Sequence, residues 1–238
     1  MCGRTRLAVP PSDLADAFDA VLPTPIDATT VVNLNVSPTD PILVVRLRRP
    51  APGGSDDVHR AHDSEVRELV RMRWGLVPFY VHDFRDGKPL INARVETVAT
   101  SRAFRDSFKK RRCLVLADGF YEWRHEGKKK IPHRVQRPDG KPFGMAGIWD
   151  RWKGKLDGED QRIETCAILT RDPSPAVAAV HDRMPLALEK ADYAAWLDPR
   201  TDEPTLQAIL SRAILDWVVT PIDRVPDAPW KKQTRLFG

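Results

Sequence analysis

The second residue of the chain, Cys2, offers the most distinctive chemistry in the sequence. Methionine aminopeptidases remove Met1 when the next side chain is small, and removal would leave an α-amine and a thiol on neighbouring carbons. An α-amine has a pKa of about 7.7 to 8, so part of it is neutral and nucleophilic at physiological pH. The amine can attack an aldehyde, and the thiolate can close a thiazolidine ring on the imine. The ordinary alternative is an incidental cysteine on a frayed terminus.

The segment INARVET at 91–97 carries an amide and a guanidinium at alternating positions. If it is a strand, Asn92, Arg94 and Glu96 share one face, because strand side chains alternate. Asn92 could then hold a sugar oxygen or a backbone group, and Arg94 could bind a phosphate. A solvated strand face explains the same pattern without function.

Two other segments supply candidate acids and bases. DGFYEW at 118–123 places Glu122 among three aromatic residues, where loss of water would raise its pKa or favour a cationic partner such as a terminal ammonium. HDRMP at 181–185 offers His181 as a titratable base and Arg183 as a phosphate-binding group on the same side of an extended chain. A strand-edge glutamate and a structural histidine are the alternatives.

The segment RMRWGLVP at 71–78 interleaves basic and aromatic residues and continues with Gly75. Its composition suits a nucleic-acid base stacked on the indole of Trp74 while the backbone approaches closely. The competing interpretation is a tryptophan buried in the core beside a turn glycine.

Composition limits the class of protein. The 238 residues are 42% hydrophobic, with a net charge of +5 and a pI near 9.2, which suits one globular domain that binds a polyanion. Three cysteines without a CxxC pair indicate neither a disulfide framework nor a zinc site, and no HExxH pattern occurs, so we expect no metal and no cofactor. Neither a signal peptide nor a membrane span is evident, which favours the cytoplasm.

The positioning elements are predicted to be mostly strands. A helix capped by Ser12, another capped by Thr100 or Ser101, and two carboxy-terminal helices at about 189–197 and 204–213 flank them. Polar stretches at 50–64 and 152–161 are expected to be hairpin loops, and the proline-rich end from Pro221 to wrap the surface. The expected strands are 41–46, 66–74, 112–118, 143–149, 164–170 and 216–220.

Six segments in order resemble the motif set of the SOS-response-associated peptidase (SRAP) family, and the resemblance spans nearly the whole chain. They are MCGR at the amino terminus, NVSPT at 35–39, RWGLVP, INARVET, RRCLVLADGFYEW and HDRMP. The resemblance implies an α+β fold, a single domain over 1–238 with a distorted β-barrel core flanked by helices. Within it, 50–64 and 221–238 would be peripheral.

The resemblance also implies roles for individual residues. Cys2 would be the nucleophile, Asn92 the group that positions the opened sugar, Glu122 the partner of the α-amine, and His181 the proton shuttle. A basic groove for single-stranded DNA would end at the cysteine pocket. Its implied contacts are Arg4, Pro38, Trp74, Gly75, Arg94, Arg102, Thr170 and Arg183.

The resulting hypothesis is a sensor and shield of abasic sites in single-stranded DNA, which forms a thiazolidine crosslink through Cys2 by lyase-like imine chemistry. The expected partner is single-stranded DNA with an abasic site, bound by a monomer near the nucleoid or replication fork without membrane or metal. Two alternatives remain: a cysteine peptidase that uses Cys2 and His181, and a non-covalent single-strand-binding module.

Overall fold

The computed structural model describes residues 2–23, 26, 32–48, 65–212, 214 and 216–227. The predicted loop at 50–64 and the last part of the predicted tail, from residue 228, lie outside the described residues. Residues 222–227 carry no helix or strand, and the chain before them ends in a short strand.

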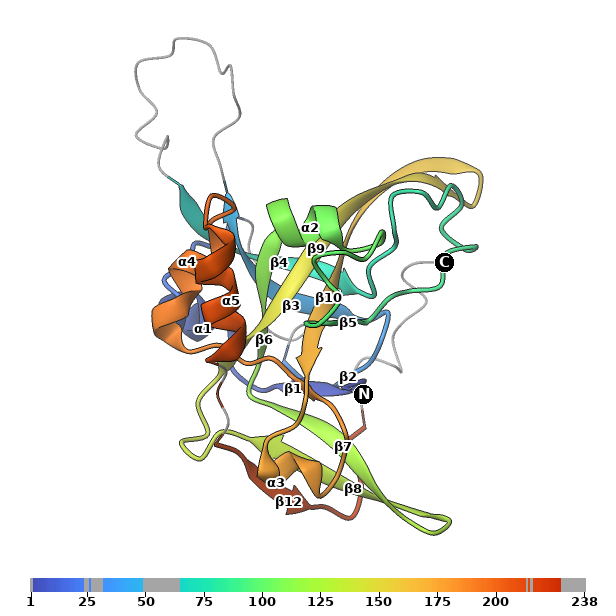
Figure 1. The fold of residues 1–238 in the computed structure, drawn as a ribbon. Coiled ribbons are helices and arrows are strands. Elements are labelled where there is room, and N and C mark those ends of the chain that lie inside the picture. Colours follow the sequence, from blue (N-terminus) through green and yellow to red (C-terminus); the bar gives the residue numbers. More distant parts are fainter. Residues whose placement is uncertain are drawn as a thin grey trace.

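The centre of the fold is a closed ring of five strands. Its order is β10-β4-β3-β6-β9, with β9 pairing back onto β10. The β4–β10 pair is parallel and the other four pairs are antiparallel. The predicted α+β single domain with a barrel-like core is therefore confirmed (Figure 1). The ring strands are β3 (Pro41–Arg48), β4 (Val66–Trp74), β6 (Arg112–Ala117), β9 (Phe143–Leu156) and β10 (Glu159–Arg171).

Two short strands extend the barrel at β10. β5 (Asn92–Arg94) pairs with it in parallel and β11 (Met184–Pro185) pairs antiparallel. Because the barrel strand lies between them, the segments INARVET and HDRMP meet at one end of the barrel.

A second sheet of five strands lies against the barrel, with the order β12-β8-β7-β1-β2. Figure 1 places the amino terminus between this sheet and the barrel. The strands are β1 (Thr5–Leu7), β2 (Asn33–Val36), β7 (Gly119–Glu126), β8 (Lys129–Gln136) and β12 (Val218–Pro221).

The helices are short. They lie on the outside of the barrel, except α3 (Pro175–Ala178), which lies beside β12 of the second sheet (Figure 1). Ser12 lies inside the first helix instead of capping it, because Pro10 is the N-cap. Phe104 occupies the N-cap of the second, which leaves Thr100 and Ser101 in the preceding turn. The helices are α1 (Pro11–Ala17), α2 (Arg105–Lys110), α3 (Pro175–Ala178), the 3-10 helix Lys190–Asp192, α4 (Tyr193–Leu197) and α5 (Glu203–Ser211).

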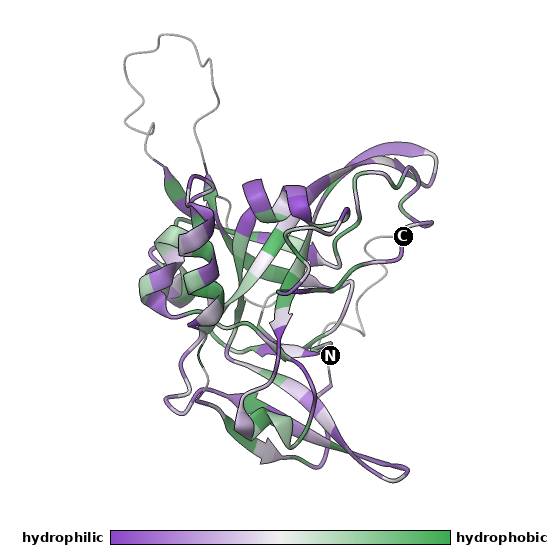
Figure 2. Cartoon of the chain, in the orientation of Figure 1, coloured by the Kyte–Doolittle hydropathy of each residue, from purple (hydrophilic) through white to green (hydrophobic). Residues whose placement is uncertain are grey.

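The predicted loop at 152–161 is wrong. Strands β9 and β10 continue through it and are joined at Asp157 and Gly158, whose φ angles are 55° and 85°. An Asp-Gly pair with both residues at positive φ forms the tight turn that matches the twist of a two-stranded hairpin. The polar composition reflects a solvent-exposed hairpin, and Figure 2 shows its far end as hydrophilic.

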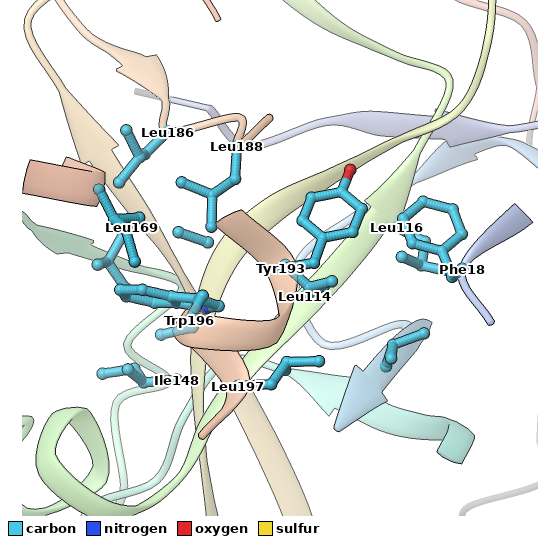
Figure 3. Packing of buried hydrophobic residues seen from close by; sticks show 14 of the residues in the cluster. Phe18, Leu114, Leu116, Ile148, Leu169, Leu186, Leu188, Tyr193, Trp196 and Leu197 are labelled. Carbon is cyan, nitrogen blue, oxygen red and sulfur yellow. The ribbon is translucent and has the colours of Figure 1, made fainter. Parts of the chain in front are cut away.

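The hydrophobic core has two parts. One fills the barrel and the space under the helices, where Trp196, Tyr193 and Phe18 pack around Leu114 and Leu169 (Figure 3). The other lies between the barrel and the second sheet and includes Cys2. The amino-terminal cysteine is thus part of a packed layer.

Candidate functional site

Strand β1 holds the amino-terminal segment in place. Its neighbours are β2 and β7, and the Asp118 carboxylate accepts a hydrogen bond from the backbone N–H of Ala8 at 2.7 Å and pairs with Arg6 at 2.8 Å. At Gly119 a Cβ would lie 3.2 Å from Arg6 Cδ, so glycine lets β1 approach β7 closely. The frayed-terminus alternative is therefore wrong for the described residues that follow Met1.

The Cys2 side chain is 0% exposed. Burial, and then the nearby Glu122 carboxylate, raise the pKa of the thiol, although the amino terminus and the backbone N–H of Arg4 act in the opposite direction. The sulfur is consequently a thiol at neutral pH, and a free amine beside it would be the first nucleophile.

Asn92 connects strand β5 to the amino terminus. Its Nδ2 donates a hydrogen bond to the Cys2 carbonyl at 2.8 Å. Its Oδ1 is buried and has no hydrogen-bond partner among the described residues. One end of the amide thus fixes the cysteine and the other remains able to accept a hydrogen bond from a ligand.

Glu122 lies on strand β7 and is 2% exposed. Burial raises the pKa of this carboxyl from its ordinary 4.5 to about 7, against the opposing effect of the amino terminus, whose charge and hydrogen bond favour the carboxylate. The pairing of Glu122 with the α-amine of Cys2 stays a prediction. A carboxyl with a pKa near 7 can both accept and return a proton at neutral pH.

His181 lies across from Glu122, with its Nε2 3.9 Å from the carboxylate Oε2. Its Nδ1 accepts a hydrogen bond from the backbone N–H of Arg183 at 3.0 Å and lies 2.8 Å from Asp182 Oδ1. Burial, followed by the charge of the amino terminus, lowers the pKa of the imidazole. Nε2 is the ring nitrogen that faces Glu122.

A pocket of about 270 Å³ opens beside this acid–base pair. It is lined by Glu122, Trp123, His125, Lys130 and His181. The sequence analysis did not assign a site role to Trp123, His125 or Lys130. Trp123 is only partly buried next to Glu122, so an aromatic face borders the pocket.

The buried carboxyl predicts a pH-dependent effect on stability. The pKa of Glu122 is higher in the folded than in the unfolded protein. The stability that its carboxyl contributes is therefore fully present below about pH 4.5 and is lost as the pH rises through about 7. A pKa difference of one corresponds to about 1.4 kcal/mol. The change that Glu122→Gln makes in the free energy of unfolding should therefore be more stabilising at pH 8 than at pH 4, by up to about 3 kcal/mol. Urea unfolding at both pH values measures this difference.

The control is Glu126→Gln, which changes an exposed carboxylate at the end of the same strand. Its effect should be the same at both pH values. If the effects of Glu122→Gln and Glu126→Gln on stability depend equally on pH, the pKa of Glu122 is not raised in the folded protein.

Arginines expected to contact DNA differ in their surroundings. Arg94 and Arg102 are exposed, and the Arg102 guanidinium lies 4.9 Å from the centre of the Tyr80 ring. Arg4 is half-buried and donates to Asn35 Oδ1 at 2.7 Å. Arg94 and Arg102 can therefore reach a phosphate without first breaking a described ion pair.

Arg183 does not lie beside His181 as a free phosphate-binding group. Its guanidinium donates to both oxygens of Glu96 at 2.7 and 2.9 Å, to Asp172 at 2.7 Å and to the Thr170 carbonyl at 2.7 Å. Strand β5 ends at Arg94, so Glu96 lies in a turn instead of continuing the face of Asn92. Arg183 therefore connects its own segment, HDRMP, to the segment INARVET through hydrogen bonds to Glu96.

Three of the expected DNA contacts are buried. Trp74 is 0% exposed and its Nε1 donates to the Ile91 carbonyl at 2.9 Å, so the expected base stacking on this indole is wrong and the packing alternative holds. Gly75 is buried with a φ of 122°, and a Cβ there would lie 2.7 Å from that of Pro89. Thr170 is 2% exposed.

Pro38 lies in the turn between β2 and β3, where it is partly exposed. The next residue, Thr39, donates its backbone N–H to the Trp74 carbonyl at 2.7 Å. Trp74 thus links this turn to the segment before Asn92, which keeps Pro38 at the surface near the site.

An exposed aromatic pair was missed by the sequence analysis. Phe79 and Tyr80 are 59% and 41% exposed, and their ring centres are 5.4 Å apart. The signal was present as two adjacent aromatic residues directly after Pro78, before a polar stretch. With Arg102 against Tyr80, they form an aromatic and basic surface suited to unpaired bases.

Within the part of the chain that the structure describes, no group of three or more His, Cys, Asp or Glu side chains could hold a metal ion. Among the same residues, no helix is long and apolar enough to cross a membrane.

Comparisons with known proteins identify the family and the fold of the chain. The family model described as SOS response associated peptidase (SRAP) matches residues 1–224. The abasic site processing protein YoqW of Bacillus subtilis is 32% identical over 214 residues, which cover 88% of this chain and 86% of that protein. The abasic site processing protein YedK of Escherichia coli is 32% identical over 199 residues, covering 83% and 79%. A crystal structure of a Bacteroides thetaiotaomicron protein, 26% identical, superposes with a TM-score of 0.76 over 93% of this chain and 92% of that one.

Proposed function

Because this chain belongs to the SOS response associated peptidase family, we propose that it processes abasic sites in single-stranded DNA by forming a thiazolidine crosslink through Cys2. The observation that carries the proposal is that two pairs of groups, Cys2 with Asn92 and Glu122 with His181, lie around the amino-terminal segment. The Cys2 backbone is held by Asn92, and Glu122 faces both His181 and the amino terminus. An acid–base pair thus lies beside the nucleophile that Met1 removal would release.

The proposed reaction joins an aldehyde and an aminothiol with loss of one water. The neutral α-amine of Cys2 adds to C1 of the ring-opened sugar, and the carbinolamine loses water to give an imine. The thiol then adds across the imine carbon, its proton passes to the nitrogen, and the five-membered ring is complete. This ring withdraws the imine from hydrolysis and from the elimination that would cleave the strand.

The surrounding groups fit the proton transfers in these steps. Glu122, whose pKa is about 7, can take a proton from the α-ammonium and return it to the departing hydroxyl. His181, whose pKa is lowered by burial, can take a proton from the C1 hydroxyl of the closed sugar and, as the imidazolium, give it to the ring oxygen during ring opening, or it can exchange a proton with Glu122. The unsatisfied Oδ1 of Asn92 can accept a hydrogen bond from a sugar hydroxyl.

The buried thiol argues for this order of events and against a cysteine peptidase. A peptidase cysteine attacks as a thiolate, whose pKa is lowered by its surroundings. Burial has the opposite effect on Cys2. An imine-first reaction needs only the amine at the outset.

The proposed DNA path follows Arg94 and Arg102, with bases stacked on Tyr80 and Phe79. Neutralising one contact should lower the slope of log affinity against log salt by about 0.7 for single strands. The double variant Arg94→Gln, Arg102→Gln is therefore expected to lower the slope by about 1.4. Fluorescence anisotropy with an intact oligonucleotide over a salt series measures it.

Arg137→Gln is the matched control, since Arg137 is bonded to Asp139 at the β8–β9 turn and is absent from the proposed path. Its slope should equal that of wild type. Equal slopes for the double variant and Arg137→Gln would remove these two arginines from the phosphate contacts.

A denaturing gel separates the three functional hypotheses. Mature protein incubated with an abasic oligonucleotide should give a band that carries both protein and DNA. A peptidase would instead cleave a peptide repeatedly without such a band, and a non-covalent binder would show salt-sensitive affinity alone.

A further inference from the structure

Two basic side chains of the β7–β8 hairpin, His125 and Lys130, line the pocket. His125 and Lys130 are directly opposite each other on the two antiparallel strands, and both border the pocket that contains Glu122 and His181. Directly paired side chains of adjacent strands project from the same face of the sheet. The pocket therefore combines an acid–base pair with a pair of potential positive charges.

The two side chains have no acidic partner of their own. Neither His125 nor Lys130 forms an ion pair with a described residue, whereas Arg124 on the other face of the hairpin is paired with Glu126. Burial is the main cause of the lowered pKa of His181, and a charge on His125 would act in the same direction. The pair thus places two basic groups at the pocket.

We propose that His125 and Lys130 form a binding site for one phosphodiester group next to the abasic sugar. This inference rests on the proposed function, because it assigns a subsite of the same pocket. An ammonium and an imidazole on opposite strands can each donate a hydrogen bond to a non-bridging oxygen of one phosphate. Holding that phosphate would fix the open sugar between Glu122 and the amine.

The neighbouring Lys129 provides a matched control. It lies one position before Lys130 on strand β8, so its side chain projects from the opposite face, and its cross-strand partner is Glu126. Lys129 is not among the residues that line the pocket. Lys129→Gln and Lys130→Gln remove the same charge from the same strand on different faces.

The test uses three abasic oligonucleotides and measures the rate of crosslinking at subsaturating DNA. One has normal phosphates, and the others carry a neutral methylphosphonate on either the 5′ or the 3′ side of the abasic sugar. Wild-type protein should lose about tenfold in rate with one of the two substituted strands, the effect of one charge-assisted hydrogen bond. Lys129→Gln should show the same sensitivity.

The double variant His125→Gln, Lys130→Gln should crosslink the normal strand about tenfold more slowly and show no further loss with either substituted strand. Lys130→Arg, with His125 unchanged, should keep part of the sensitivity to methylphosphonate that the double variant loses, because the charge is retained. Thermal unfolding checks that each variant folds.

The proposal is overturned if the double variant keeps the full sensitivity to methylphosphonate, or if Lys129→Gln loses it equally. An adduct on the Lys130 amine would also overturn it, since that lysine would be a nucleophile. Failure of the proposed function gives a different result, because no strand would then crosslink through residue 2 in any variant.

Discussion

Protein whose amino terminus is blocked, by a retained Met1 or an amino-terminal tag, is expected to give no adduct with abasic DNA, even in borohydride. The amide nitrogen has its lone pair delocalised, so the imine cannot form. The loss should be complete, because every later step uses the imine carbon. The gel assay on tagged protein, before and after removal of the tag by a protease that leaves Cys2 first, measures it.

Cys2→Ser separates the two nucleophiles of the same residue. Its α-amine can still form an imine, but its hydroxyl is a much poorer ring-closing group than a thiol. A band should then be seen chiefly when borohydride reduces the imine, and strand cleavage should increase because elimination is no longer intercepted. Tagged protein that crosslinks as fast as the mature form would contradict the role of the amine.

His181→Ala is expected to slow crosslinking by about 100 to 10,000-fold without abolishing it. The imidazole Nε2 lies 3.9 Å from Glu122, so its loss removes one of the two groups that can move protons at the pocket. The aminothiol is retained, so the final yield should fall less than the rate. Time courses of adduct formation between pH 5 and 8 measure both quantities.

The control for His181→Ala is His133→Ala. His133 is a buried histidine on strand β8 of the second sheet, and its Nδ1 lies 3.0 Å from the Ile131 carbonyl oxygen. His133 is opposite Glu122 on strand β8 but does not line the pocket. Time courses of His181→Ala that match wild type across this pH range would remove His181 from the mechanism.

The sequence was sufficient to predict the five barrel strands and β12, but not β1, β2, β8 or β11. Runs of β-branched and other apolar residues marked strands such as β3 and β4, and the candidate roles of Cys2 and Glu122 followed from local chemistry. These features depend on neighbouring residues in the chain, which is why pattern and composition were informative.

Features that depend on contacts between distant segments could not be predicted in the same way. Trp74 reads as a stacking residue in its own segment, but the barrel buries it and Ile91 satisfies its indole N–H. Arg183 reads as a phosphate ligand, but the turn after β5 brings Glu96 to it. In both cases the partner lies far along the chain, and only the fold determines whether the side chain is available.

The β7–β8 hairpin shows the opposite error. Its run of three lysines at 128–130 is typical of solvated surface charge, and the sequence does not reveal which lysine faces the pocket. The cross-strand register assigns Lys130 to the pocket side with His125, and Lys129 to the other face with Glu126. A difference of one residue thus separates a candidate ligand from an ordinary surface charge.

Mass spectrometry of the digested adduct tests the central claim most directly. Mature wild-type protein incubated with abasic DNA should yield a peptide that lacks Met1 and carries the sugar remnant on residue 2, at the mass of the aldehyde plus the peptide minus one water. The thiol of that peptide should be inaccessible to alkylation, because the sulfur is part of the ring. A remnant on an internal lysine, or on residue 2 with a thiol that still alkylates, would contradict the thiazolidine mechanism.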